Sequence, residues 1–350
     1  MHNLIRWNYS LQPHNTFGLH AFARAFAYAR SIDELQMLLS VQAPKFATTK
    51  ILGGGSNIVL TGDLDALVIK IALQGITVLE ESATTLDIEI AAGEEWDTIV
   101  RYAVQRNWGG IENLSCIPGT VGAAPVQNIG AYGVELCEYV RTVKCIARST
   151  GEIFELSNAE CLFGYRDSIF KHALREEAII TSLVLRLRKN PQLGDLRLHY
   201  GTVEQELHSL FPHVSRNSYT IRHVREAVSS IRRSKLPDPT TVGNAGSFFK
   251  NPDIPLEHYR LLQARYPEIP GFILSGTRVK VPAAWMIEQC GWKGKRLHAH
   301  SDAAVHDRQS LVLVNYGRAH GKEIVELSQQ IQQSVRERFG IDLVPEVNIW

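Results

Sequence analysis

A glycine-rich run at 118–133 constrains this chain more than any other segment. Its sequence is PGTVGAAPVQNIGAYG, and it contains no charged side chain. Because glycine lacks a Cβ, a backbone rich in glycine can bring its N–H groups directly against a phosphate or a planar ring. The run therefore predicts a loop that holds a nucleotide cofactor.

A second glycine cluster, Gly53-Gly54-Gly55-Ser56-Asn57, lies between the short apolar runs 50–52 and 58–60. It predicts a tight turn between two strands, and two such loops favour one diphosphate held from two sides. Each loop alone is weak evidence, because glycine clusters are more often ordinary turns. The clusters lack the Gly-Lys-Ser/Thr of a P-loop, and Ile58 stands where the dinucleotide fingerprint needs Gly or Ala. A P-loop kinase and a Rossmann domain are both disfavoured.

Composition excludes several classes of function. The chain has 350 residues, enough for two or three domains, and 37 basic against 36 acidic side chains. This balance gives no electrostatic reason for binding nucleic acid or an anionic membrane. Residues 1–8 do not read as a secretory leader, and no run approaches the roughly 18 apolar residues of a membrane span. We expect a soluble, cytoplasmic monomer without nucleic-acid or membrane partners.

Neither the cysteines nor the histidines predict a metal centre. The cysteines are odd in number and form no C-x-x-C pair, which indicates buried free thiols in a reducing compartment. They are Cys116, Cys137, Cys145, Cys161 and Cys290. Only His298-Ala-His300-Ser-Asp302, with His306 beyond it, has metal-like spacing. Loop histidines of this kind are usually solvated or hydrogen-bonded, so no metal site is expected.

Hydrophobic patterns predict an α+β fold. A capping box begins a helix at Ser31, and two further helices are predicted at 96–104 and 224–233. Strands are predicted at 51–52, 58–60, 66–71, 85–91, 140–147, 153–156 and 179–187. Since strands and helices do not alternate regularly, α+β is favoured over α/β.

The C-terminal third is expected to form a separate block. A polar segment at 190–219 predicts a long functional loop, and the two prolines of 235–239 predict a linker. A last helix with apolar residues from Ile324 to Phe339 should stop at Gly340. The alternation at 341–350 predicts a strand with Leu343, Val347 and Ile349 on one face.

Two short motifs carry side chains suited to catalysis. Ser247, in the turn 243–252, reads most simply as a serine that satisfies its own backbone. Ser247-x-x-Lys250 also matches the penicillin-interacting acyl enzymes, but S-D-N and K-T-G are absent. The serine could instead donate a proton to a strongly basic carbanion in a site that excludes water. Arg166, between aromatic residues, could grip a carboxylate with two hydrogen bonds or form a structural ion pair with an acid.

Six separated motifs together resemble one enzyme family. They lie at 53–57, 117–133, 161–171, 235–239, 243–252 and 345–347. Their order and spacing resemble those of the UDP-N-acetylenolpyruvoylglucosamine reductases, the MurB flavoenzymes of peptidoglycan synthesis, over residues 15–347. The C-terminal block resembles that of the first of the two types into which this family is divided.

The resemblance implies a two-part FAD-binding module of the vanillyl-alcohol-oxidase kind followed by an α+β substrate-binding domain. We expect the parts at 1–72, 73–230 and 231–350, with the last strand returning to the FAD module. FAD is expected to be bound non-covalently, and NADPH and UDP-N-acetylglucosamine enolpyruvate are the implied substrates. The implied cofactor-binding residues are Gly53, Gly54, Gly55, Ser56, Asn57, Pro118, Gly119, Gly122, Ala123, Gln127, Asn128, Gly130, Ala131 and Tyr132.

The resemblance also implies roles at the reacting end of the substrate. Arg166 and Glu346 would polarise the carboxylate, and Ser247 would protonate the α-carbon. The implied substrate-binding residues are Tyr165, Tyr200, Arg232, Lys235 and Asn251, with Tyr200 closing over the diphosphate. Two alternatives remain open: an FAD-dependent oxidase of the same fold, and a non-catalytic sensor of a nucleotide sugar.

Overall fold

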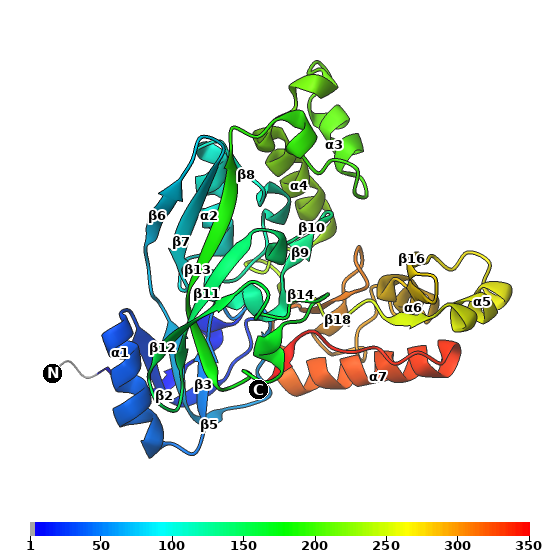
Figure 1. Ribbon diagram of the computed structural model, residues 1–350. Coiled ribbons are helices and arrows are strands. Elements are labelled where there is room, and N and C mark those ends of the chain that lie inside the picture. The colour runs from blue at the N-terminus through cyan, green and yellow to red at the C-terminus, as the bar shows by residue number, and fades with distance from the viewer. Residues whose placement is uncertain (1–3) are drawn as a thin grey trace. The chain divides into compact units, whose positions relative to one another are not determined.

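The computed structural model describes residues 4–350, which form two compact units (Figure 1). The first unit contains the chain up to Tyr9, then Ala23–Gly54 and Asp65–Ser234. The second unit contains Ser10–Phe22, Gly55–Leu64 and Lys235–Trp350. The chain contains helices and sheets whose strands are mostly antiparallel, which confirms the predicted α+β class.

A four-stranded sheet lies largely in the first unit. Its order is β1 (Arg6–Ser10), β2 (Phe22–Ala29), β5 (Leu64–Ile71) and β3 (Thr49–Leu52). β3 and β5 are parallel, and helix α1 (Ile32–Met37) lies between β2 and β3 in the chain. The Ser31 hydroxyl accepts a hydrogen bond from the Glu34 N–H at 3.1 Å, which confirms the predicted cap.

A larger antiparallel sheet forms the centre of the first unit (Figure 1). Its order is β12 (Ile153–Ser157), β11 (Val140–Ala147), β13 (Ala178–Lys189), β7 (Thr85–Ala91) and β6 (Ile76–Glu81), and β8 (Trp108–Gly109) also pairs with β13. β13 lies between β11 and β7 and is almost entirely buried, which explains its long apolar run. Helix α2 (Trp96–Gln105) buries the predicted apolar stripe in the same core.

Two helices follow this sheet in the chain, α3 (Val203–Leu210) and α4 (Ile221–Lys235). The prediction of a long loop at 190–219 was wrong, because the segment contains α3 and two 3-10 turns. Val203 and Leu207 are completely buried and pack into the core of the first unit. An apolar face of only two residues in a polar segment is too short to give a helical periodicity that predicts the helix.

The second unit contains three small sheets and three helices. One sheet has the order β14 (Gly243–Ser247), β19 (Val312–Asn315) and β18 (Ala303–Val305), and another has β15 (Asp253–Pro255), β17 (Arg278–Lys280) and β16 (Phe272–Ser275). The helices are α5 (Leu256–Arg265), α6 (Ala283–Gln289) and α7 (Gly321–Phe339). Helix α7 packs on β18 and β19 and ends at Gly340, whose φ of +65° confirms the predicted stop.

The predicted C-terminal strand is largely wrong. Only β20 (Asn348–Ile349) is a strand, and it pairs in parallel with β4 (Ile58–Val59) of the same unit. Leu343 and Val347 are buried as expected, but Ile349 is 49% exposed. Pro345 has no N–H to donate, so regular pairing is interrupted there. The three predicted domain boundaries stay predictions.

The cysteines carry no disulfide, and all five thiols are free. Cys145 and Cys161 are buried as expected, and burial raises the pKa of each thiol to about 12. The prediction of burial was wrong for the other three, which are half-buried. No helix within residues 4–350 has the length and apolar character needed to cross a membrane.

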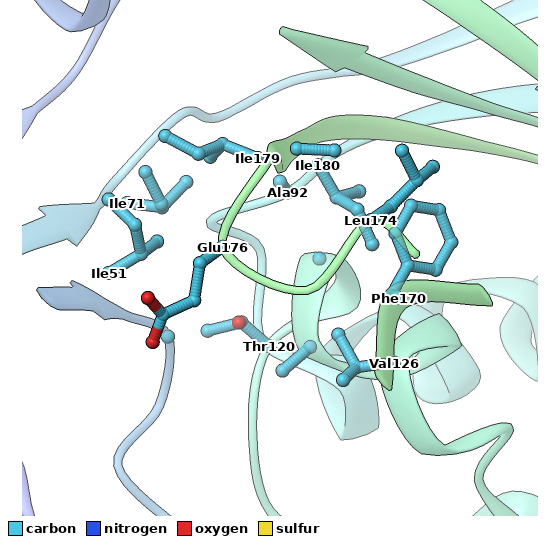
Figure 2. Close-up of a pocket in the computed structure, with 14 residues that line it drawn as sticks. Ile51, Ile71, Ala92, Thr120, Val126, Phe170, Leu174, Glu176, Ile179 and Ile180 are labelled. Atoms are coloured by element: carbon cyan, nitrogen blue, oxygen red, sulfur yellow. The ribbon is translucent and has the colours of Figure 1, made fainter. Parts of the chain in front are cut away.

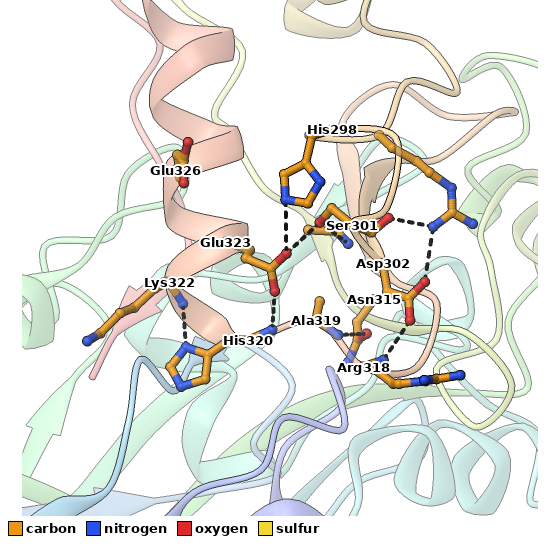
Figure 3. A network of polar contacts seen from close by, with 12 residues as sticks. His298, Ser301, Asp302, Asn315, Arg318, Ala319, His320, Lys322, Glu323 and Glu326 are labelled. Carbon is orange, nitrogen blue, oxygen red and sulfur yellow. Dashed lines mark hydrogen bonds and ion pairs between the residues drawn. The ribbon is translucent and has the colours of Figure 1, made fainter.

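The histidine run at 298–302 belongs to a polar network at the start of α7 (Figure 3). The Glu323 carboxylate accepts hydrogen bonds from the Ser301 hydroxyl at 2.7 Å and from the His320 N–H, and it faces His298 at 3.8 Å. Asp302 accepts from Arg296 and from the Arg318 N–H, each at 3.0 Å. In the described part of the chain, no three His, Cys, Asp or Glu side chains are grouped to hold a metal ion.

Candidate cofactor and substrate site

The two predicted glycine loops meet inside the first unit. A Cβ added to Gly54 would lie 2.7 Å from the Gly119 Cα, and one added to Gly53 would lie 2.9 Å from the Thr120 Oγ1. At Gly122 an added Cβ would lie 2.6 Å from the Ala92 Cβ. These positions therefore require glycine because the loops press against each other and against β7's end.

Gly122 is needed because its backbone lies close to Ala92, and not because its N–H group binds a phosphate. The Gly122 N–H donates to the Ala92 oxygen at 2.9 Å, and the Val121 N–H donates to the Glu94 oxygen at 2.9 Å. These donors are already used inside the protein, so the predicted backbone cradle does not extend to them. Lys70 supports the other loop by donating to the Gly53 oxygen at 2.7 Å, and burial lowers the pKa of its ammonium.

A cavity of about 190 Å³ opens beside the two loops (Figure 2). It is lined by Gly53, Thr120, Gly122 and Ala123 of the loops, by Glu176, and by an apolar wall of Ile51, Ile71, Ala92, Val126, Phe170, Leu174, Ala178, Ile179 and Ile180. Sites for whole drug-sized ligands usually measure about 300–1,000 Å³, so this cavity suits one flat ring system. A dinucleotide with one ring buried here and its diphosphate near the glycine loops fits these residues.

Three hydrogen bonds tie the Arg166 segment to the second glycine loop. The Ser168 hydroxyl donates to the Val126 oxygen at 2.7 Å, and the Asn128 side chain donates to the Gly164 oxygen at 3.0 Å. The Arg166 guanidinium donates to the Gly130 oxygen at 2.6 Å. Arg166 has a φ of +52°, a conformation that is uncommon for a residue with a side chain and often marks a functional site.

The structural alternative for Arg166 was an ion pair with a neighbouring acid. The adjacent carboxylate, Asp167, is hydrogen-bonded to the His172 Nε2 at 2.8 Å. The Tyr165 ring lies beside Arg166, whose Cζ is 5.5 Å from the ring centroid. The hydrogen bond to Gly130 holds the guanidinium against the glycine loop, and the role of Arg166 toward a carboxylate stays a prediction.

A second arginine lies in the same electrostatic environment. The Arg232 Nε donates to the Cys116 oxygen at 3.2 Å, and burial, reinforced by repulsion from Arg166, lowers the pKa of its guanidinium. Burial raises the pKa of the Tyr132 phenol despite the charge of Arg232. Tyr200 packs on the glycine loop, since a Cβ added to Gly133 would lie 3.0 Å from the Tyr200 Cβ. Tyr200 is exposed, and the two arginines give this part of the unit the positive charge that an anionic ligand needs.

The second unit brings Ser247 and Glu346 onto adjacent segments. The Glu346 N–H donates to the Phe248 oxygen at 2.8 Å, and the Lys250 N–H donates to the Val344 oxygen at 2.9 Å. The Asn57 side chain donates to the backbone carbonyl oxygen of Glu346 at 3.2 Å. Ser247 is exposed at the end of β14, and its hydroxyl makes no hydrogen bond to residues 4–350. The interpretation of Ser247 as a self-satisfied turn serine therefore loses its support.

The other predicted residues have structural contacts of their own. Gly55 needs its φ of +69° and its missing Cβ, which would lie 1.9 Å from the His14 oxygen. The Asn251 side chain accepts a hydrogen bond from the Ala283 N–H at 2.9 Å and thereby begins α6. Lys235 is the exposed last residue of α4. The roles assigned to these residues, and to the remaining loop residues Ser56, Pro118, Gln127 and Ala131, stay predictions.

Sequence reasoning missed several residues of this site. The Asn113 side chain donates to the Tyr132 oxygen at 3.0 Å and to the Arg197 oxygen at 2.9 Å, which joins the glycine loop to the segment before Tyr200. Glu176 and Phe170 line the cavity although they belong to a turn distant from both glycine loops in the chain. The one unusual local feature of Glu176 is its left-handed backbone conformation, and a glutamate in the sequence does not predict that conformation.

Comparisons with known proteins identify the family of this chain. An FAD binding domain family matches residues 23–157, and the family described as UDP-N-acetylenolpyruvoylglucosamine reductase, C-terminal domain, matches residues 238–350. The reductase of that name from Chromobacterium violaceum is 46% identical over 98% of both chains, and that from Flavobacterium johnsoniae is 44% identical over 99% of both. A crystal structure of the reductase (MurB) from Thermus caldophilus has a TM-score of 0.66 at 23% identity, covering 99% of this chain and 98% of its own, which supports the fold. The chain therefore belongs to the UDP-N-acetylenolpyruvoylglucosamine reductase family.

Proposed function

We propose that this chain is an NADPH-dependent flavoenzyme that reduces the enolpyruvyl group of UDP-N-acetylglucosamine enolpyruvate to UDP-N-acetylmuramate during peptidoglycan precursor synthesis. The observation that carries the proposal is the hydrogen bond from Arg166 to the Gly130 oxygen. It joins the side chain that is predicted to bind the substrate carboxylate to the loop that is predicted to hold the cofactor. Family membership at full chain length supports the same reaction.

FAD fits the residues of the first unit. The touching glycine loops accept no larger side chains, and the cavity beside them has apolar walls suited to one ring of the cofactor. When bound, FAD supplies hydride transfer from NADPH to the substrate. The glycine motifs contain no His or Cys for a covalent link, although Cys116 borders one of them.

Residues of the first unit would bind and orient the substrate. Arg166 would hold the enolpyruvyl carboxylate and stabilise the negative charge that develops there when the β-carbon receives hydride. The guanidinium of Arg232 would attract the diphosphate, and Tyr200 would cover it. The burial of the Arg232 guanidinium supports this assignment, because an anionic ligand would stabilise a buried cation.

Residues of the second unit would complete the reaction. We propose that the exposed hydroxyl of Ser247 donates a proton to the α-carbon and that the Glu346 carboxyl acts on the substrate carboxylate together with Arg166. Lys235 and Asn251 would contact the nucleotide part of the substrate. The adjacency of the Ser247 and Glu346 segments supports a joint role for these two side chains.

Anaerobic spectroscopy of the purified protein tests the proposal. The protein should carry a flavin absorption band that is bleached by NADPH and restored by the enolpyruvyl substrate, and acid should release the flavin into solution. A protein that cannot be reconstituted with FAD would refute the cofactor assignment. Flavin that NADPH does not bleach would favour the nucleotide-sugar sensor, and substrate-dependent oxygen consumption would favour the oxidase. Monomeric state and cytoplasmic location stay predictions.

A further inference from the structure

Glu176 differs from every other side chain that lines the cavity beside the glycine loops. Within the described chain it is the one ionisable residue of that lining, among aliphatic and aromatic side chains, glycines and one threonine. Figure 2 shows its carboxylate between Ile51 and Thr120, and the side chain is 66% exposed, which places it at the mouth of the cavity. An apolar pocket with a single charged acceptor is suited to a ring system that carries few hydrogen-bond donors.

The backbone of Glu176 is held in an unusual conformation. Its φ is +66°, which a residue with a Cβ seldom adopts. The Arg148 guanidinium donates to the backbone carbonyl oxygen of Glu176 at 3.2 Å and to the backbone carbonyl oxygen of Thr49 in β3 at 2.7 Å. Arg148 also donates its N–H to the Glu177 oxygen at 2.8 Å. These contacts fix the turn against β3, and such strain is often retained where a side chain has a function.

Protein contacts leave the Glu176 carboxylate able to accept hydrogen bonds. Its nearest cation is Lys50, whose Nζ lies 4.0 Å from the Glu176 Oε1, beyond hydrogen-bond distance. The Glu176 side chain is 66% exposed, and an ion pair this exposed contributes little to stability. In the described residues no donor lies within hydrogen-bond distance of the carboxylate, so stability does not explain its place at the cavity mouth.

We propose that Glu176 makes this protein select the flavin adenine dinucleotide over the flavin mononucleotide. Its carboxylate accepts a hydrogen bond from a donor on the adenosine half, either the exocyclic amine of adenine or a ribose hydroxyl. The apolar wall of the cavity covers the adenine ring. The inference rests on the proposed function, because FAD is the ligand it assumes.

Binding of flavins to the apoprotein tests the inference without measuring turnover. Titration calorimetry would compare FAD and FMN on the wild type, on Glu176→Ala and on Glu177→Ala. Glu177 is the matched control, since it is exposed in the same turn but does not line the cavity. Loss of a hydrogen bond to a charged group should weaken FAD binding to Glu176→Ala by about ten- to hundredfold. FMN binding, and both affinities of Glu177→Ala, should not change.

Two further measurements separate the possible results. Flavin hypoxanthine dinucleotide replaces the adenine amine by a carbonyl. If the amine is the donor, the wild type should bind this analogue more weakly than FAD, whereas Glu176→Ala should bind both alike. If a ribose hydroxyl is the donor, Glu176→Ala should weaken both to the same extent. Glu176→Gln, which keeps the shape of the side chain, repeats the comparison if the alanine variant misfolds.

The inference is overturned if Glu176→Ala and Glu176→Gln bind FAD as tightly as the wild type, or if they lose FAD and FMN affinity equally. An equal loss would mean that the substitutions disturb the glycine loops. Failure of the wild-type apoprotein to bind FAD would instead refute the cofactor of the proposed function. The two failures are therefore distinguishable.

Discussion

The substitution Arg166→Lys tests whether the guanidinium binds the substrate carboxylate. The guanidinium donates to the Gly130 backbone oxygen at 2.6 Å, and its planar fork carries N–H groups in a geometry that matches a carboxylate. A lysine ammonium keeps the charge but cannot reproduce the parallel pair of hydrogen bonds. Loss of one hydrogen bond to a charged group costs about 1.5–3 kcal/mol, which corresponds to roughly a ten- to hundredfold slower step.

Stopped-flow absorbance separates the two half-reactions. We expect Arg166→Lys to slow flavin reoxidation by the enolpyruvyl substrate while reduction by NADPH stays within about twofold of wild type. Arg175→Lys is the matched control, because Arg175 is an exposed residue of the following turn that does not line the cavity. Near-normal reoxidation in Arg166→Lys would show that the arginine serves only to hold the glycine loop.

Three further predictions concern proton donation, loop packing and pH. Ser247→Ala should slow flavin reoxidation by about two to four orders of magnitude without affecting reduction, and unimpaired reoxidation would remove the serine from the mechanism. Gly54→Ala should destabilise the apoprotein by about 1–3 kcal/mol in urea unfolding, because its Cβ would lie 2.7 Å from the Gly119 Cα, whereas Gly62→Ala has open space and should unfold normally. Burial acts to raise the pKa of Glu323, but hydrogen bonds from the His320 N–H and the Ser301 hydroxyl outweigh it and hold the pKa below its usual value. The stability that Glu323 contributes should therefore be complete above its unfolded pKa of about 4.3 and disappear as pH falls through the lower folded value. Glu323→Gln should flatten this part of the pH dependence of the urea midpoint, and an unchanged profile would contradict the assignment.

Much of the fold was readable from local patterns. Strands β7 and β11 begin and end at the predicted residues, and in β7 the apolar Leu86, Ile88 and Ile90 alternate with Asp87 and Glu89. Helix α2 and the end of α7 at Gly340 were predicted from equally local signals, an apolar stripe and a residue that tolerates positive φ. The glycine motifs were likewise predicted as two loops of one site, because several motifs in one order resemble a single family.

Other features depend on residues that are distant in the chain. The helix in 190–219 and the short strand at 348–349 follow from tertiary packing, which a polar or mixed pattern of a few residues does not reveal. Contacts with Ala92 and Glu94 occupy two N–H groups of the glycine loop, which therefore cannot donate to a phosphate. Glu176 reaches the cavity mouth because Arg148 fixes its turn against β3. Residue types and spacings encode local conformation, whereas these contacts arise only when segments about 30 to 100 residues apart are brought together by the sheets.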